Sequence, residues 1–475
     1  MADNSLEVRH SLIGGKPVSS SDLLEVHNPW DGALVGTVTK VDTSTLERAL
    51  SQAEAAPLSR YERSQILHRT RALLDERRES FAQCICKESG LCMRETLYEV
   101  GRSLDVLEFA AMEALRDDGQ VFSCDLTAQG KARKIFTLRE PVQLVAAITP
   151  FNHPLNQVAH KLAPAVACGA PMILKPSDKT PLTALRFAEL LYEAGLPSSM
   201  LSVLLGEINT VVTPLVQDSR VEMVAFTGSV AIGKHLAKTV GYKKLCLELG
   251  GNSPLIVLDD ADLDLAIALA AEGCFRNSGQ RCTAVKRLLI HENILDIFTE
   301  RFVERAKDYH YGDPSNASTR VGTVIDEASA TRLDRVVRAA VHDGAEILLG
   351  GQYDRGACYP PTVLGKVARH SEMVMEESFG PLAPIMAIHD LEDAIALANN
   401  TAYGLSSAIV TNNMDHAIKA VKGIRTGTVN VNEVPGYRIE SSPFGGVKDS
   451  GLGIKEGVIE AMKFMTNTKT FSLPW

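Results

Sequence analysis

Residues 144–176 read LVAAITPFNHPLNQVAHKLAPAVACGAPMILKP and contain a short apolar run, a longer segment of helical period and a second short apolar run. The runs LVAAIT (144–149) and PMILKP (171–176) have the length and composition of buried strands, and NQVAHKLAPAV (156–166) has helical spacing despite Pro164. A strand, a helix and a second strand in this order form the repeating unit of a parallel sheet covered by helices. The stretch therefore predicts an α/β fold.

The alternation of strand-like and helical segments continues toward the C-terminus. Further strands are expected at MLSVLL (200–205), VEMVAF (221–226) and two runs within 244–260, and helices at 181–194, near 208–217, at 229–240 and at 263–275. A second α/β region is expected over 283–435, with strands at KRLLIH (286–291), GTVIDE (322–327) and SSAIVT (406–411) and with helices at 294–308 and 328–341. The chain is therefore predicted to contain two α/β regions.

A different pattern occurs just before the first predicted βαβ unit. Residues 122–145, FSCDLTAQGKARKIFTLREPVQLV, form two alternating runs around AQGKA, which indicates a long hairpin. An exposed two-stranded arm cannot bury both of its faces, so it usually pairs with another element or another subunit. The C-terminal segment MKFMTNTKTFSLPW (462–475) is also strand-like. Arm and tail are the candidates for an oligomer interface.

Composition restricts the class of protein. The 475 residues correspond to about three domains or subdomains at roughly 150 residues each. With 49 Lys and Arg against 58 Asp and Glu, a net charge of -9 and no stretch dense in basic residues, a nucleic acid partner is not expected. Nine cysteines and no signal sequence argue against disulfides and favour the cytoplasm. Neither a membrane-spanning segment nor a bound metal is expected.

A candidate phosphate-binding turn lies in FTGSVAIG (226–233). The common dinucleotide fingerprint GxGxxG is absent, because its closest match, at Gly451 and Gly453, has Glu456 in place of the third glycine. In FTGSVAIG a strand enters a Gly-Ser turn and a helix starts at Ser229, so free N–H groups and the positive end of the helix dipole would face a pyrophosphate. A simple helix cap is the alternative interpretation.

Cys282 stands in a setting unlike that of the other cysteines. The sequence around it, NSGQRCTAVKR, is polar and contains glycine, and Arg281 directly precedes the cysteine. A neighbouring guanidinium lowers the pKa of a thiol, and the thiolate is the form that attacks electrophiles. Glu248, in LELGGN, follows a strand-like run and precedes two glycines. An incidental thiol in a loop and a satisfied carboxylate at a strand end remain the alternatives at this point.

Eight segments together resemble the aldehyde dehydrogenase superfamily over nearly the full chain. They are TPFNHPLN (149–156), LKPSDKTP (174–181), FTGSVAIG (226–233), LELGGNSP (247–254), GQRC (279–282), EESFGP (376–381), TAYGLSS (401–407) and PFGGVKDSG (443–451). The resemblance implies two α/β domains and a small bridging β element, in a homodimer or homotetramer. It places a Rossmann-like NAD-binding domain at 1–121 and 142–251, a catalytic domain at 252–438 and the oligomerisation element at 122–141 and 458–475.

The same resemblance implies the chemistry. Cys282 would be the nucleophile that forms a thiohemiacetal with the aldehyde. Asn152 would donate, with the Cys282 backbone N–H, to the developing oxyanion, and Glu248 would activate the water that hydrolyses the thioester. Two alternatives, an inactive binding protein and a hydrolase, lack support because the three residues are present and GxSxG is absent. A CoA-acylating enzyme is disfavoured because Glu248 supplies a hydrolytic base.

NAD is the implied cofactor. Lys175 and Asp178 fall where the family holds the adenosine ribose, and Glu377 and Phe379 where it holds the nicotinamide ribose and ring. An acidic side chain at position 178 repels a 2'-phosphate, which leaves NADP as the poorer alternative. The other residues expected to bind the cofactor are Ile148, Thr149, Ser177, Gly228, Ser229, Gly233 and Leu249.

The expected substrate is a small anionic aldehyde. Four residues that are or can become cationic are expected around Cys282, and together they favour a dianionic head group: Arg102, His153, Arg281 and Arg438. This arrangement resembles phosphonoacetaldehyde dehydrogenases and non-phosphorylating glyceraldehyde-3-phosphate dehydrogenases. FNHP (151–154), EVPGYR (433–438) and the terminal SLPW favour the first. The expected reaction is oxidation of phosphonoacetaldehyde to phosphonoacetate with NAD, in phosphonate catabolism.

Overall fold

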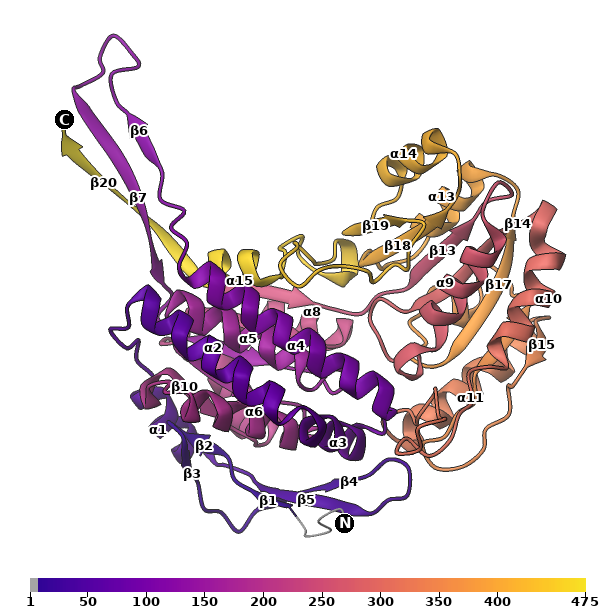
Figure 1. Cartoon of the computed structure of the whole chain (residues 1–475), viewed down its shortest axis with the longest axis horizontal. Helices are drawn as coiled ribbons and strands as arrows, with labels where there is room; N and C mark the ends of the chain where they lie inside the picture. The colour runs from indigo at the N-terminus through magenta and orange to yellow at the C-terminus, as the bar shows by residue number, and fades with distance from the viewer. Residues whose placement is uncertain (1–6) are drawn as a thin grey trace.

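The computed structural model describes residues 7–475, so the first six residues of the expected segment 1–121 lie outside the described part. It contains two seven-stranded sheets and two three-stranded sheets. In Figure 1 the first large sheet and its helices occupy the lower left, and the second occupies the right. The predicted α/β fold with two such regions is therefore confirmed.

The first large sheet has the strand order β12-β11-β8-β9-β10-β2-β3. Its strands are Lys244–Glu248 (β12), Met223–Thr227 (β11), Val145–Ile148 (β8), Met172–Lys175 (β9), Leu201–Val203 (β10), Leu12–Ile13 (β2) and Lys16–Pro17 (β3). The first five are parallel, and β2 joins β10 in the antiparallel direction. Because of this register Glu248, Thr227 and Lys175 all lie at the carboxyl edge of the sheet, where open α/β sheets bind their ligands.

Helices cover both faces of this sheet. They are α1 (Thr43–Gln52), α2 (Arg60–Glu76), α3 (Arg78–Ser89), α4 (Met93–Ala114), α5 (Asn156–Cys168), α6 (Pro181–Glu193), a π-helical turn at Ile208–Val212 that leads into α7 (Thr213–Gln217), α8 (Val230–Thr239) and α15 (Val458–Phe464). A small sheet in the order β1-β5-β4 lies nearby, formed by Glu7–Arg9, Leu34–Thr39 and Leu23–His27. The strands and helices expected over 144–275 are all present within a few residues.

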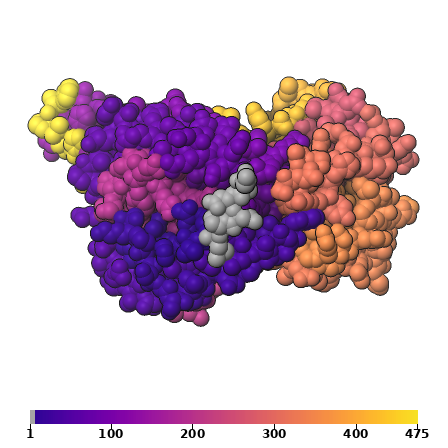
Figure 2. All heavy atoms as spheres, turned by 60° about the horizontal axis from the view of Figure 1, so that its bottom comes forward, coloured from indigo at the N-terminus to yellow at the C-terminus, as the bar shows by residue number. Residues whose placement is uncertain are grey.

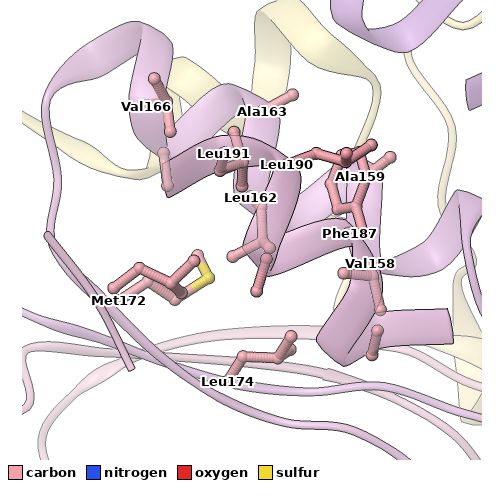
Figure 3. Close-up of a cluster of buried hydrophobic side chains, with 14 of the residues drawn as sticks. Val158, Ala159, Leu162, Ala163, Val166, Met172, Leu174, Phe187, Leu190 and Leu191 are labelled. Carbon is pink, nitrogen blue, oxygen red and sulfur yellow. The ribbon is translucent and has the colours of Figure 1, made fainter. Parts of the chain in front are cut away.

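The central βαβ unit is held by apolar packing. In Figure 3 side chains of α5, α6 and β9 meet in one cluster, among them Leu162, Phe187 and Leu174. Phe187 and Leu174 are fully buried and Leu162 is 2% exposed, and burying a side chain of this size contributes about 1.5–3 kcal/mol. Every residue of α5 except Gln157 is buried, including Pro164, so packing outweighs the backbone hydrogen bond that a proline removes.

The second large sheet has the strand order β15-β16-β17-β14-β13-β18-β19. Its strands are Glu346–Leu349 (β15), Thr362–Gly365 (β16), Leu382–Ile388 (β17), Val285–His291 (β14), Ser253–Val257 (β13), Ser406–Val410 (β18) and Thr428–Val431 (β19). Its helices are α9 (Leu263–Phe275), α10 (Leu295–Ala306), α11 (Glu327–His342), α12 (Glu372–Met375), α13 (Leu391–Asn399) and α14 (Met414–Gly423). All pairs are parallel except β15 with β16.

One predicted strand of this region is wrong. GTVIDE (322–327) lies in a loop that leads into α11, where Asp326 caps the helix. Val324 and Ile325 are buried, but their N–H groups donate to the carbonyl of Ala357 and to the side chain of Gln280 instead of to a neighbouring strand. The apolar run therefore reflects burial under a loop, while the central strand β17 was not predicted.

The predicted hairpin and tail form one sheet. Its order is β20-β7-β6, with strands Thr466–Pro474 (β20), Arg133–Pro141 (β7) and Val121–Ser123 (β6). Figure 1 shows this sheet extending away from the rest of the molecule, and in Figure 2 the C-terminal strand projects at one end. The two strands of the hairpin differ in length, since β7 pairs along its full length with β20 but pairs with the shorter β6 at three residues only. That copies of the chain associate through this sheet stays a prediction.

Within residues 7–475 no helix combines the length and the apolar character needed to cross a membrane.

Candidate active site

The loop that carries Cys282 lies between α9 and β14. Asn277 and Ser278 in this loop have φ values of 57° and 53°, in the left-handed region, and Gly279 follows with a φ of 68°. A Cβ on Gly279 would lie 2.0 Å from the carbonyl oxygen of Gly380, so only glycine fits there. The tight loop brings Cys282 against the segment that follows Glu248, where a Cβ on Gly251 would lie 2.5 Å from the Cys282 carbonyl oxygen.

The thiol of Cys282 is partly exposed, and its charge environment differs from the predicted one. Burial raises the pKa of Cys282, and the strongest opposing influence is the ammonium of Lys286. The guanidinium of Arg281, which was expected to act on the thiol, instead donates from Nη2 to the carbonyl oxygens of Glu272 (3.0 Å) and Gly273 (2.9 Å) at the end of α9. The charge of Arg281 still interacts with Cys282, but Lys286, which was not predicted, is the strongest influence that lowers the thiol pKa.

Asn152 lies against the same loop. Its side-chain Nδ2 donates to the backbone carbonyl oxygen of Gln280 at 2.9 Å, and its backbone carbonyl oxygen accepts from Nδ2 of Asn277 at 3.0 Å. The side chain is buried. The first bond orients the side-chain amide toward the loop of Cys282, and the second holds the backbone of Asn152. Among residues 7–475 the amide makes this one hydrogen bond, so a further N–H can donate to a bound group.

Glu248 ends β12 and is buried. Neither of its carboxylate oxygens has a hydrogen-bond partner within residues 7–475. Burial raises the pKa of Glu248 well above its usual range, and the nearby carboxylate of Glu456 raises it further, while Arg438, Lys161 and Lys455 oppose the rise. A carboxylate with a raised pKa takes up a proton more readily than an ordinary carboxylate, which suits a general base.

A buried ion pair accompanies Glu248. Nζ of Lys161 donates to Oε1 of Glu456 at 2.7 Å, and the lysine side chain has no exposed surface. Although burial alone would raise the pKa of Glu456, Lys161 lowers it, which is opposite to the shift of Glu248. Neither Lys161 nor Glu456 was predicted to belong to the site.

Polar groups gather at the carboxyl edge of the first sheet. Nζ of Lys175 lies 2.7 Å from Oδ1 of Asp178, and the hydroxyl groups of Thr149 and Thr227 are buried without a partner among the described residues. Ser229 caps α8 by accepting from the N–H of Ile232. The other residues expected to bind a cofactor lie on the same edge or next to it: Ile148, Ser177, Gly228, Gly233 and Leu249. Unpaired hydroxyls, a lysine and a helix N-terminus together suit an anionic dinucleotide.

Glu377 and Phe379 lie between this edge and the nucleophile. Oε1 of Glu377 accepts from the N–H of Gly251 at 3.0 Å and lies 3.3 Å from Nζ of Lys286. Phe379 has a φ of 52° and packs its ring edge-on against Phe151 at 5.9 Å. Glu377 thus contacts the segment that follows Glu248 and the strand that follows Cys282, and Phe379 contacts the loop that contains Asn152.

Two of the predicted substrate residues share a buried carboxylate. Nε of Arg102, on α4, donates to Oε1 of Glu440 at 2.5 Å, and Nη2 of Arg438 lies 3.9 Å from Oε2 of the same group. Nε2 of His160 contacts Oε2 at 2.5 Å. The Arg438 guanidinium also lies 3.8 Å from the centroid of the Phe444 ring. Burial alone would raise the pKa of Glu440, but His160, Arg102 and Arg438 lower it.

His153 lies beside a second buried carboxylate. Its Nδ1 is 3.6 Å from Oε2 of Glu99, too far for a hydrogen bond, and burial lowers its pKa. Oε1 of Glu99 accepts from the N–H groups of Leu155 and Asn156 at the start of α5. The charges of Arg102 and Arg281 also act on His153.

The charge of Arg102 thus acts on both His153 and Arg438, and the charge of Arg281 acts on His153 although its Nη2 donates to the end of α9. Glu440, Glu99 and Lys286 were not identified from the sequence. Only Lys286 carried a signal, because it is a charged residue within the apolar run KRLLIH of a buried strand.

Comparison with known proteins identifies relatives across the whole chain. The model of the aldehyde dehydrogenase family matches residues 17–471. A sulfoacetaldehyde dehydrogenase from Neptuniibacter caesariensis is 36% identical, over 95% of this chain and 99% of the relative. Aldehyde dehydrogenase 21 from Physcomitrella patens, solved with its product succinate, has a TM-score of 0.96 and 34% identity, with 99% and 98% of the two chains covered.

A glyceraldehyde-3-phosphate dehydrogenase from Methanocaldococcus jannaschii, solved with NADP, has a TM-score of 0.92 and 35% identity, and 96% of this chain and 100% of that one are covered.

Proposed function

Because this chain belongs to the aldehyde dehydrogenase family and is an oxidoreductase that acts on aldehydes with NAD or NADP, we propose that it oxidises phosphonoacetaldehyde to phosphonoacetate with NAD. The observation that carries the proposal is a pair of buried nitrogens, Nδ1 of His153 and Nη1 of Arg438, that lack a hydrogen-bond partner within residues 7–475. An unpaired buried donor costs about 1–3 kcal/mol. The three oxygens of a phosphonate group would accept from Nη1 of Arg438, and from Nδ1 of His153 in the tautomer that carries the proton there.

The charge balance around these donors also favours an anion. Arg102 and Arg438 share the single carboxylate of Glu440, while burial lowers the pKa of His160 and so favours its neutral form. The charge on Glu99 is met by N–H groups at the positive end of the α5 dipole. The cluster therefore keeps a positive charge that a bound anion would neutralise.

The closeness of the Arg438 charge to Cys282 favours a short substrate. In phosphonoacetaldehyde the phosphorus is two bonds from the reacting carbon. Arg438 is close enough to Cys282 and Glu248 for its charge to oppose the rise of both pKa values. A cation so near the nucleophile suits a short aldehyde. The related sulfoacetaldehyde dehydrogenase is named for a two-carbon aldehyde with a sulfonate in the same position.

In the proposed reaction the thiolate of Cys282 adds to the aldehyde carbon, and the oxyanion accepts from the Asn152 amide and the Cys282 backbone N–H. The bound dinucleotide supplies the hydride acceptor. Glu248 then takes a proton from the water that attacks the thioester, and its raised pKa suits that task. The C–S bond of the thioester breaks, phosphonoacetate leaves, and the thiolate of Cys282 is restored, with the proton from water held on Glu248 until solvent removes it.

We propose NAD over NADP because Asp178 is exposed beside Lys175 at the carboxyl edge of the sheet. A carboxylate there accepts from ribose hydroxyls and repels a 2'-phosphate. Lys175, Ser177 and Asp178 would hold the adenosine half, Ser229 at the start of α8 the pyrophosphate, and Glu377 with Phe379 the nicotinamide half.

A panel of short aldehydes tests the substrate. We expect kcat/KM with NAD to be highest for phosphonoacetaldehyde and at least about 100-fold lower for propanal, because two lost charge-assisted contacts cost about 3 kcal/mol or more. Sulfoacetaldehyde should lie between them. The initial rate of NADH formation measures each value. Faster turnover of glyceraldehyde-3-phosphate with NADP would refute the proposal.

That result would instead support the second candidate, a non-phosphorylating glyceraldehyde-3-phosphate dehydrogenase. The similarity to the NADP-bound glyceraldehyde-3-phosphate dehydrogenase, at 35% identity over nearly the whole chain, favours this alternative. A phosphate two bonds further from the reacting carbon would need cations more distant from Cys282 than Arg438 is.

Replacing Arg438 by methionine should raise KM for phosphonoacetaldehyde at least about tenfold, because one charge-assisted contact is lost. KM for propanal should change by less than about twofold. Methionine keeps a long apolar chain against Phe444, and Arg320→Met is the matched control, since Arg320 stacks on Tyr309 elsewhere in the molecule. Steady-state kinetics at saturating NAD gives both constants. An unchanged KM for the phosphonate would show that Arg438 does not bind it.

A further inference from the structure

Lys286 contacts the nucleophile loop from β14. Its Nζ donates to the backbone carbonyl oxygens of Arg281 (2.7 Å) and Cys282 (3.2 Å) and lies 3.3 Å from Oε1 of Glu377. It also lies 5.9 Å from the centroid of the Phe379 ring. The three hydrogens of the ammonium therefore meet three oxygens, and two of these belong to the loop that presents the thiol.

The neighbouring residue of β14 shows that this arrangement is particular to Lys286. Arg287 is equally buried, but its guanidinium donates to the carbonyl oxygens of Asn252, Leu397 and Ala398, away from the cysteine. A buried ammonium costs free energy unless oxygens surround it. The cation that this strand presents to the nucleophile is thus Lys286, and its surroundings compensate its burial.

We propose that Lys286 is a positioning residue for the nucleophile: it fixes the backbone of Cys282, and its positive charge favours the thiolate, while Glu377 competes for the same ammonium. Because the carboxylate of Glu377 lies 3.3 Å from Nζ of Lys286, it offsets part of the positive charge that favours the thiolate. The proposal concerns ionisation of the thiol in the protein without aldehyde, so it does not depend on which aldehyde the enzyme oxidises.

The groups that face Cys282 act in two directions. Lys286 on β14 and Arg438 favour the charged thiolate, and burial, Glu377 and Glu248 disfavour it. Arg281, the preceding residue, is held by the carbonyls of α9. Two single substitutions should therefore have opposite effects, which a general loss of structure would not produce.

The test measures the rate at which iodoacetamide alkylates Cys282 between about pH 6 and pH 10, with the Cys282 peptide quantified by mass spectrometry. The full chain is used without cofactor or aldehyde. Lys286→Met should raise the midpoint of the profile by about one pH unit and slow alkylation near pH 7 about tenfold. Lys286→Arg should restore most of the rate. Glu377→Gln should shift the midpoint downward and speed alkylation.

Lys244→Met is the matched control, because Nζ of Lys244 donates to two carbonyl oxygens, those of Phe464 and Thr466, at 3.1 and 2.7 Å. It should leave the alkylation profile unchanged. A wild-type profile for folded Lys286→Met would overturn the proposal. If that variant does not fold, Glu377→Gln decides the question, and an unchanged or slower alkylation of Cys282 in it would overturn the proposal as well.

Discussion

Replacing Cys282 by serine is expected to lower kcat/KM for aldehyde oxidation by about 10⁴-fold or more. A serine hydroxyl ionises far less readily than a thiol, and the charge of Lys286 near this position cannot make up the difference. The nucleophile and its base act as a unit, so loss of the nucleophile removes nearly the whole covalent pathway. The initial rate of NADH formation with phosphonoacetaldehyde measures the effect, and NAD binding measured by calorimetry should be unchanged.

The matched control for this prediction is Cys124→Ser. Cys124 is a free cysteine that is partly exposed on the arm, next to β6, and it lies away from the catalytic loop. Its substitution should leave kcat/KM within about twofold of the original value. Aldehyde oxidation at an undiminished rate in Cys282→Ser would exclude the thiohemiacetal mechanism.

The fold could be predicted from the sequence because its elements follow local patterns. Strands such as β8 and β9 are short apolar runs buried on both faces, and α5 between them has helical period, so periodicity alone locates the βαβ unit. GTVIDE has the same apolar character, yet it is a loop, because its N–H groups find partners in other loops. The local sequence pattern cannot distinguish a buried backbone that hydrogen-bonds to a neighbouring strand from one that hydrogen-bonds to loops.

Of the site, the sequence indicated the residues that we propose to act on the aldehyde, and it did not indicate the charged side chains that surround them. Cys282, Asn152 and Glu248 stand in motifs, whereas Glu440 lies in the undistinguished segment YRIES. Its pairing with Arg102 joins residues 338 positions apart, and no local rule anticipates such a contact. Because this contact is so distant in sequence, Arg102 and Arg438 were predicted without a partner, whereas in the structure they share the carboxylate of Glu440.

Glu248→Gln should separate the two halves of the reaction. The first turnover should still yield about one NADH per active site in a rapid burst, because hydride transfer does not need the base. Steady-state kcat should then fall about 10²–10⁴-fold, since the glutamine cannot take a proton from the attacking water. Stopped-flow absorbance gives the burst and the steady rate in one experiment, and mass spectrometry should show the acyl group on Cys282.

The rate of thioester hydrolysis should depend on pH through the ionisation of Glu248. The base is the ionised carboxylate, and burial with Glu456 nearby raises the pKa of Glu248 well above its usual range. Hydrolysis of the thioester should therefore quicken as the pH rises through that pKa, and Glu248→Gln should lose this increase. Glu88→Gln is the control, because Glu88 is also buried and its pKa is raised by burial to about 8, but it binds the start of α6. Loss of the burst in Glu248→Gln would mean that Glu248 acts before or during hydride transfer. That result would contradict the assignment of Glu248 to thioester hydrolysis alone.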